Sequence, residues 1–100
     1  SRIEFTDDVF DRADLIAVDS LRGVRDLSTE FRTHYGENED AWKGVKTLAS
    51  LISDEQTRPV GADVTLFKAM GMGLSDLALA IEILRRARAE NRGQKVPKRI

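Results

Sequence analysis

The sequence contains no cysteine, and its other chemically active groups are sparse. Without cysteine the chain forms neither disulfides nor thiolate metal sites. Its one histidine, His34, has no second histidine or carboxylate cluster to complete a metal site, and no Ser/His/Asp set is present. His34 lies at the end of a predicted helix, a position typical of a surface histidine that the helix dipole favours. We therefore expect no metal site and no complete catalytic constellation in these residues.

An excess of charge of either sign is also lacking, since 16 Lys and Arg face 17 Asp and Glu. A balanced chain creates no general field that attracts nucleic acid or an anionic membrane, so neither is expected as a partner. No run approaches the roughly 20 apolar residues that cross a bilayer, and no signal peptide opens the sequence. These features favour a cytoplasmic protein. One hundred residues allow one small domain at most.

The most informative stretch is residues 64–93, which hold a short apolar run, a glycine-rich elbow and the longest predicted helix. Residues 64–67 mix β-branched and large apolar side chains and predict a buried strand. A helix from about residue 75 to 91 follows, with Gly73 or Ser75 as its N-cap and Gly93 as its stop.

The apolar residues of that helix cover almost its whole circumference: Leu74, Leu77, Ala78, Leu79, Ala80, Ile81, Ile83 and Leu84. Such a helix is normally buried on two sides. We therefore expect it to pack at a subunit or domain interface.

A strand, Gly71-Met72-Gly73 and a helix also suggest a dinucleotide-binding G-x-G-x-x-G fingerprint. Asp76 stands where the third glycine should be, and no later strand supplies an acidic ribose ligand. The fingerprint reading therefore fails.

A second strand is predicted at residues 15–18, where a continuous apolar run between acids is typical of a parallel strand covered on both faces. Residues 64–67 are its one predicted partner, and two strands do not make a stable parallel sheet. We therefore expect the chain to be part of a larger protein and to be marginally folded alone, with self-association or binding of a hydrophobic dye.

The remaining elements are predicted to be helical. Thr6 should cap a short helix that turns Val9 and Phe10 inward, and Ser20 should cap an amphipathic helix over residues 21–35. Residues 42–52 predict two short helical pieces broken near Gly44, with Trp42 as a core anchor. The predicted fold class is thus α/β, mostly helical with two short strands.

The run from Thr65 to Asp76, reading T-L-F-K-A-M-G-M-G-L-S-D, resembles the C-terminal signature of the ornithine cyclodeaminase/mu-crystallin family, T-[LV]-F-[KD]-S-[VL]-G followed by an aspartate. The resemblance extends back through residues 13–20 and 48–52 and covers nearly the whole chain. It implies the C-terminal part of a Rossmann-type nicotinamide-binding domain with its connecting helices over residues 1–62. Residues 63–100 would be the return segment, with its helix, into a substrate and dimerisation domain.

The same resemblance implies three site residues. Arg2 matches a basic residue near the nicotinamide, Ala69 a cofactor-binding position that is commonly serine, and Met70 a position lining the substrate site. Alanine at position 69 lacks the hydroxyl donor and acceptor, so only backbone contacts remain there. Ala69 and Met70 are equally compatible with plain packing beneath the glycine elbow. The catalytic aspartate of the family is expected just upstream of Ser1.

Arg58, in a polar loop, matches a family loop near the active-site mouth, although a solvated arginine is the simpler interpretation.

The intact protein implied by this resemblance is an NAD(P)-dependent enzyme of amino or imino acids, catalysing oxidative deamination with cyclisation or ketimine reduction. Its expected cofactor is NAD or NADP, and its expected partners are the substrate, the rest of the same protein and a second subunit in a homodimer. The chain alone is expected to be inactive. Two alternatives stay open: a non-catalytic cofactor-binding or dimerisation module of the mu-crystallin type, and an unrelated helical interaction domain.

Overall fold

The computed structural model describes residues 2–98, and the chain divides into two compact units. Unit 1 ends at Met70 and unit 2 begins at Gly71. The sequence placed the division after residue 62, ahead of the strand at residues 64–67. That strand belongs to unit 1 because it pairs with the sheet of this unit.

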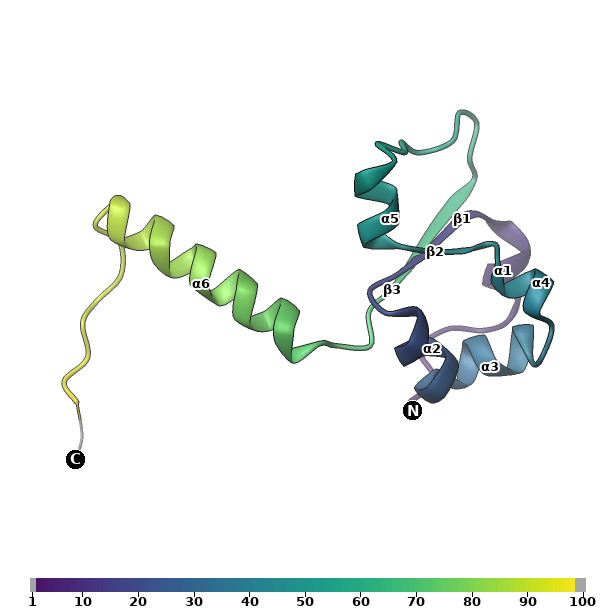
Figure 1. The fold of residues 1–100 in the computed structure, drawn as a ribbon, viewed down its shortest axis with the longest axis horizontal. Coiled ribbons are helices and arrows are strands. Elements are labelled where there is room, and N and C mark those ends of the chain that lie inside the picture. Colours follow the sequence, from purple (N-terminus) through teal and green to yellow (C-terminus); the bar gives the residue numbers. More distant parts are fainter. Residues whose placement is uncertain (1, 99–100) are drawn as a thin grey trace. The chain divides into compact units, whose positions relative to one another are not determined.

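Unit 1 alternates short helices with short strands (Figure 1). Its elements are α1 (Asp8–Arg12), β1 (Ala13–Val18), α2 (Leu21–Leu27), α3 (Thr29–Tyr35), α4 (Glu39–Trp42), β2 (Val45–Thr47), α5 (Leu48–Ser53) and β3 (Val64–Lys68). The three strands form one parallel sheet in the order β2-β1-β3. The predicted α/β class and both predicted strands are confirmed.

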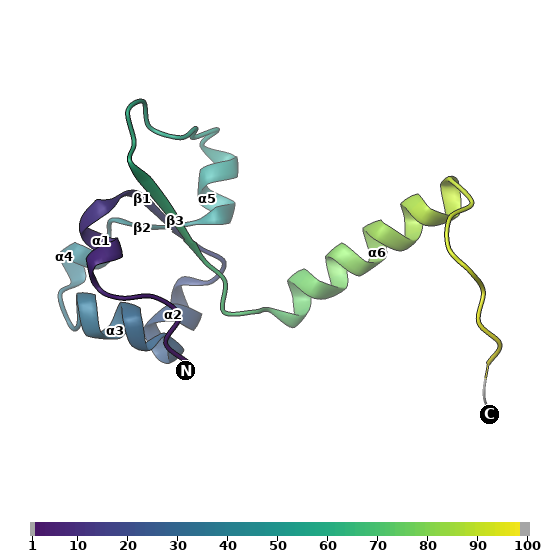
Figure 2. The same ribbon diagram turned by 180° about the vertical axis from the view of Figure 1, so that it is seen from behind.

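The third strand, β2, corrects the prediction of two helical pieces broken near Gly44. The apolar spacing of Trp42, Val45 and Leu48 fits a helix as well as a strand, so it does not decide between them. Pairing with β1 decides, because Ile16, Ala17 and Val18 of β1 lie opposite Val45, Lys46 and Thr47. With β2 on one side and β3 on the other, β1 has the two neighbours that its apolar run requires (Figure 2).

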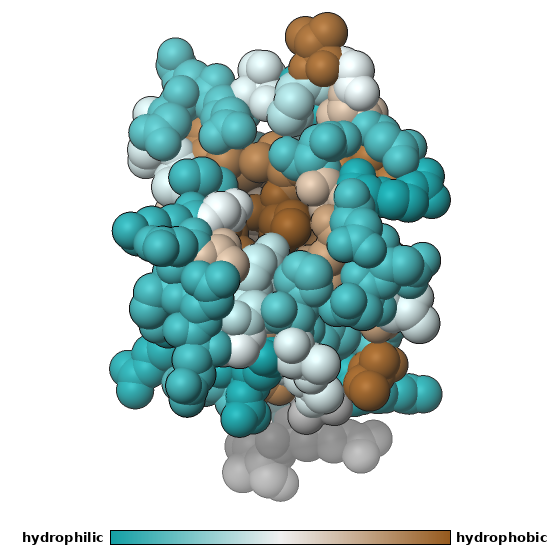
Figure 3. All heavy atoms as spheres, turned by 90° about the vertical axis from the view of Figure 1, so that its right-hand side faces the viewer, coloured by the Kyte–Doolittle hydropathy of each residue, from teal (hydrophilic) through white to brown (hydrophobic). Residues whose placement is uncertain are grey.

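The core lies between one face of this sheet and helices α1 to α4. Its buried apolar residues are Phe10, Val18, Val24, Phe31, Trp42 and Val45. The rings of Phe10 and Phe31 meet edge to face with centroids 5.1 Å apart, a favourable geometry for aromatic pairs. The predicted inward position of Phe10 and the anchoring role of Trp42 are confirmed. On the face seen in Figure 3, hydrophilic side chains surround a central hollow where apolar atoms are visible.

The sequence predicted that β1 is covered on both faces of the sheet. In the structure the two faces are covered unequally. Leu66 of β3 packs against the core, whereas the next side chain, Phe67, points the other way and is 51% exposed. Ala17 of β1 is buried, so the opposite face is partly covered.

The single helix predicted for residues 21–35 is two helices divided at Ser28. Ser28 is fully buried, donates its backbone N–H to the Val24 carbonyl and caps α3 by accepting the Phe31 N–H at its hydroxyl. A serine competes with helix continuation because its side chain satisfies the amides of a new helix start. The predicted cap at Ser20 is confirmed, since its hydroxyl accepts the Gly23 N–H at 3.0 Å.

The first helix also starts differently from the prediction. Asp7 rather than Thr6 occupies the N-cap position of α1, and the Thr6 hydroxyl donates to the Asp8 carboxylate.

Unit 2 consists of α6 (Gly73–Ala89) and the short segments before and after it. Met72, not Gly73 or Ser75, is the N-cap, and the helix ends two residues earlier than predicted, although Gly93 has the positive φ of 94° that suits glycine. None of the 17 residues of α6 is buried. No helix within residues 2–98 is both long enough and apolar enough to cross a membrane.

Candidate functional site

The carboxyl ends of β1 and β3 lie side by side in the parallel sheet. The chain leaves β1, adds β2 on one side and later adds β3 on the other, so the strand order reverses between β1 and β3. Open α/β sheets bind ligands outside the carboxyl ends of their strands at such a reversal. This edge of unit 1 is therefore the candidate site, and it holds Asp19 and Ser20 after β1 and Ala69 and Met70 after β3.

Asp19 joins the carboxyl ends of β1 and β3 through hydrogen bonds. Its two carboxylate oxygens accept the backbone N–H of Met70, at 3.1 and 3.0 Å, and its own N–H donates to the Lys68 carbonyl at 3.3 Å. Hydrogen bonds to a charged acceptor are among the stronger ones in proteins. The backbone that leaves β3 is thus held in place at the end of β1.

The two predicted residues after β3 differ in exposure. Ala69 is exposed, whereas Met70 is half-buried and packs against the core. Gly23 in the first turn of α2 comes close to Met70, because a Cβ built on this glycine would lie 3.6 Å from the Met70 Cβ and 3.3 Å from the Ser20 Cβ. Met70 is therefore in part a packing residue, and Ala69 is the one of the pair whose side chain is open to a ligand.

Arg2, the third predicted residue, is exposed on the segment before α1. Two contacts of Glu4 hold this segment to unit 1: its N–H donates to Glu30 Oε2 at 3.2 Å, and its carboxylate accepts from Lys68 Nζ at 2.5 Å. Lys68 is the residue before Ala69. The fold thus links the Arg2 segment to the end of β3, through an ion pair rather than by direct contact of the predicted residues.

A buried ionic cluster of Lys68, Glu30 and Ser28 lies behind this edge. Lys68 is 5% exposed and Glu30 is 7% exposed, with 3.6 Å between Lys68 Nζ and Glu30 Oε2. The Ser28 hydroxyl donates to Glu30 Oε1 at 3.3 Å. The sequence pattern did not predict this cluster, and the one signal it contains is a lysine that directly continues an apolar strand.

The charges in the cluster stabilise one another. Burial opposes the ionised form of Glu30, but backbone N–H groups of Glu30 and Glu4 and the charge of Lys68 outweigh it and lower the pKa of Glu30. Burial likewise opposes the charge of Lys68, yet the hydrogen bond to Glu4 and the charges of both glutamates raise the pKa of Lys68. Both groups are therefore ionised at neutral pH.

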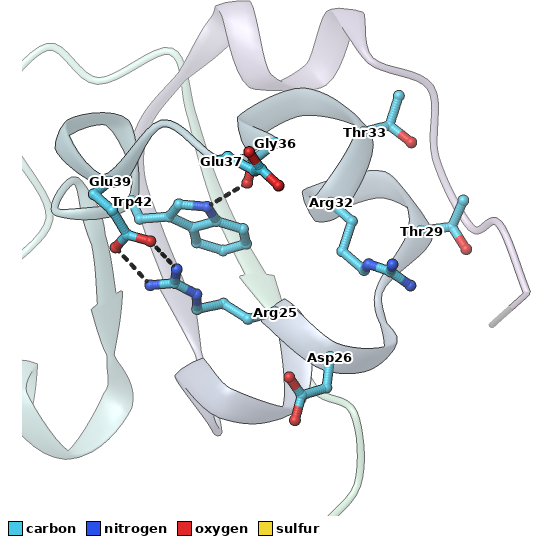
Figure 4. A pocket seen from close by; sticks show the side chains of 9 residues that line it. All are labelled: Arg25, Asp26, Thr29, Arg32, Thr33, Gly36, Glu37, Glu39 and Trp42. Atoms are coloured by element: carbon cyan, nitrogen blue, oxygen red, sulfur yellow. Dashed lines mark hydrogen bonds and ion pairs between the residues drawn. The ribbon is translucent and has the colours of Figure 1, made fainter.

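A separate hollow of about 750 Å³ lies on α2, α3 and α4 (Figure 4). Arg25 lies over the Trp42 ring, 4.9 Å from its centroid, and forms a two-point pair with Glu39 that lowers the pKa of this carboxyl. The Trp42 Nε1–H donates to the Gly36 carbonyl at 3.0 Å. The predicted residues Arg2, Ala69 and Met70 do not line this hollow. Of its charged side chains, Arg25 and Glu39 are paired with each other, and Asp26 pairs with Arg22 one turn earlier on α2.

The loop arginine Arg58 also has structural partners. Its guanidinium donates to the Thr65 hydroxyl at 2.8 Å and to the backbone carbonyls of Ala62 and Asp63. These bonds hold the loop that enters β3, at the opposite end of the strand from Ala69. The position of Arg58 favours a role in the loop rather than at the candidate site.

The candidate site presents the exposed Ala69, while the Asp19 carboxylate and the Met70 N–H are bonded to each other. Within residues 2–98, no group of three or more His, Asp or Glu side chains is placed to hold a metal ion. Comparisons of the chain with family models, with curated proteins and with solved structures found no match. The functional assignment therefore depends on the residues and geometry of this edge.

Replacing Asp19 with alanine should release the backbone after β3. A hydrogen bond to a charged group contributes about 1.5–3 kcal/mol, so the Met70 amide should exchange with solvent deuterium roughly 10 to 100 times faster. Asp14→Ala is the matched control, because Asp14 accepts the Asp63 N–H at the other end of β1. Hydrogen exchange followed by NMR checks this. Equal acceleration of Met70 exchange in both variants would show that Asp19 has no local role.

Proposed function

We propose that this chain is the C-terminal part of an NAD(P)-dependent enzyme that resembles ornithine cyclodeaminase and acts on amino or imino acids. The intact protein would contain a Rossmann-type domain and a substrate and dimerisation domain, and it would work as a cytoplasmic homodimer. The proposal rests on one observation, which is that the Met70 N–H donates to the Asp19 carboxylate. It fixes the segment with the family-like sequence at the strand reversal, where α/β sheets bind their cofactors.

The proposed roles follow from exposure and position. Exposed Ala69 would present its backbone to the cofactor carboxamide, and Arg2 would lie near the nicotinamide end. Half-buried Met70 would form an apolar wall of the substrate site while its N–H stays bound to Asp19. The proton-transferring aspartate is expected upstream of Ser1, so the 100-residue chain alone should be inactive.

When bound, NAD or NADP would supply the hydride chemistry that interconverts an amine and an imine at the substrate α-carbon. The contribution of this chain would be orientation. The Glu4–Lys68 ion pair holds the Arg2 segment, and Asp19 holds the Ala69 segment. A misplacement of about 1 Å at either segment can cost on the order of 100-fold in rate.

The decisive experiment recovers the protein encoded with residues upstream of Ser1. An aspartate a few positions before Arg2, preceded by a glycine fingerprint, should accompany reduction of the nicotinamide cofactor with a basic amino acid such as ornithine, or its oxidation with a cyclic imine. The 100-residue chain assayed in parallel should do neither. Turnover is followed by absorbance of the reduced nicotinamide.

Ala69→Ser in that protein tests the site itself. One added neutral hydrogen bond contributes up to about 1 kcal/mol, so the cofactor Kd should fall by up to about fivefold. Ala49→Ser, a change at an exposed position of α5, is the control and should leave the Kd unchanged.

The runner-up function is a non-catalytic cofactor-binding or dimerisation module. Alanine at position 69, in place of the serine common in the family, and the exposed apolar side chains of α6 favour it. If no upstream aspartate exists, or if the longer protein binds cofactor without turnover on amino and imino acids, this function replaces the enzyme.

A further inference from the structure

One face of α6 carries four large apolar side chains that are exposed to solvent. Leu74, Leu77, Ile81 and Leu84 are each between 51% and 73% exposed. At 100° per residue they fall on one side of the helix, and we call this row the α6 seam. Exposing four such side chains to water is unfavourable, because burying apolar surface is favourable.

The seam has the spacing of a coiled-coil helix, with intervals of three, four and three residues. This series is the same when read from either end. Two antiparallel copies therefore match layer for layer, with Leu74 opposite Leu84 of the other copy and Leu77 opposite Ile81. We propose that α6 forms an antiparallel pair with α6 of a second copy of this chain.

The charges of α6 favour the antiparallel direction. Asp76 lies in the first turn, whereas Arg85, Arg86 and Arg88 gather toward the other end, where Glu82 pairs with the first two. Arg88 continues the seam four residues after Leu84, so a parallel pair would place the Arg88 side chains of the two copies side by side, and like charges at this separation repel. An antiparallel pair puts the two arginine groups at opposite ends and brings each near the acidic first turn of the other helix.

Small residues flank the seam at its midpoint. Ala78 and Ala80 stand on either side of it, and both are exposed. Side chains of this size allow two helix axes to approach to about 8 Å, the close end of the usual range. The self-matching spacing, the separated charges and the small flanks together select a second copy as the partner. The inference rests on the homodimer of the proposed function but not on its chemistry, because the tests below need neither cofactor nor substrate.

The first test measures the mass of the full 100-residue chain by sedimentation at micromolar concentrations. The native chain should be a dimer, and L77D with I81D should make it a monomer by weakening association at least 100-fold. L79D with I83D is the matched control, because these exposed apolar residues lie on the opposite side of the helix. The control variant should remain a dimer.

Fluorescence of Trp42, the single tryptophan, separates dissociation from misfolding. Trp42 is buried in unit 1, so its emission should be the same in the native chain and in both double variants. A native chain that is monomeric at 100 μM overturns the proposal. A dimer that survives L77D with I81D, or that is lost equally in the control variant, also overturns it.

Direction is tested with a spin label at A89C, which is straightforward because the chain has no native cysteine. Antiparallel pairing about the seam midpoint separates the two labelled positions by about 30 Å along the axis, at 1.5 Å per residue. Parallel pairing would leave them about 10 Å apart across the pair. A short distance in pulsed spin-resonance measurements would exclude the antiparallel pair.

Discussion

Replacing Lys68 with alanine should unfold unit 1. The change leaves the Glu30 carboxylate buried without the cation that faces it, and it removes the partner of Glu4. Loss of one member of a buried ion pair costs about 3–5 kcal/mol, and small domains have only about 5–15 kcal/mol of stability in total. The urea midpoint of Trp42 fluorescence should fall steeply, or the native signal should be absent before urea is added.

Two variants make this result specific. Lys46→Ala removes an exposed lysine of β2 and should change stability by less than about 0.5 kcal/mol. Lys68→Met combined with Glu30→Gln removes both buried charges and should recover most of the stability lost in Lys68→Ala. If the double variant were no more stable than Lys68→Ala, packing rather than charge would explain the role of Lys68.

The same cluster fixes the direction of the pH dependence. The pKa of Glu30 is lower in the folded chain than its ordinary value of 4.5, so its stabilisation is complete above that value and is lost as the pH falls below it. The pKa of Lys68 is raised above 10.5, so its stabilisation is complete below that value and is lost as the pH rises further. The groups that face this pair are the Glu4 carboxylate, which lies at the surface, and the Ser28 hydroxyl. In the variant that lacks both charges, the free energy of unfolding should therefore fall less steeply as the pH drops below about 4.5 than in the native chain.

Phe31→Ala should have an effect of similar size for a different reason. Phe31 is fully buried at the centre of unit 1 and contacts the rings of Phe10, Tyr35 and Trp42. Deleting a buried phenylalanine ring costs about 3–5 kcal/mol through lost transfer free energy and the cavity left behind. Urea denaturation followed by circular dichroism should show loss of most of the stability.

Phe67→Ala is the matched control for this prediction. It deletes the same ring from β3, but Phe67 is half exposed on the other face of the sheet. Its free energy of unfolding should fall by much less than that of Phe31→Ala. Equal losses in the two variants would contradict the placement of the core on the α1 to α4 side of the sheet.

Several features of this fold could be read directly from local sequence. The apolar run at residues 15–18 and the β-branched run beginning at Val64 predicted β1 and β3, because continuous apolar stretches of this length suit strands of a parallel sheet. A serine at position 20, directly before an amphipathic run, indicated the N-cap of α2, and the large apolar ring of Trp42 indicated a position in the core. These features follow from neighbouring residues alone.

Other features were decided by contacts between residues far apart in the chain. Val45–Thr47 has a spacing that fits helix or strand, and its pairing with β1 makes it a strand. Lys68 lies inside the unit only because Glu4 and Glu30 face it there, and no local pattern brings these three residues together.

The candidate site shows the same division. The sequence pattern determined which residues follow β3 and that α6 has apolar side chains around its circumference. The tertiary structure decided that Asp19 holds the Met70 amide and that an ion pair links the Arg2 segment to Lys68. Periodicity depends on neighbours within a few residues, whereas these contacts join positions 51 and 64 residues apart and form only when the parallel strands pair.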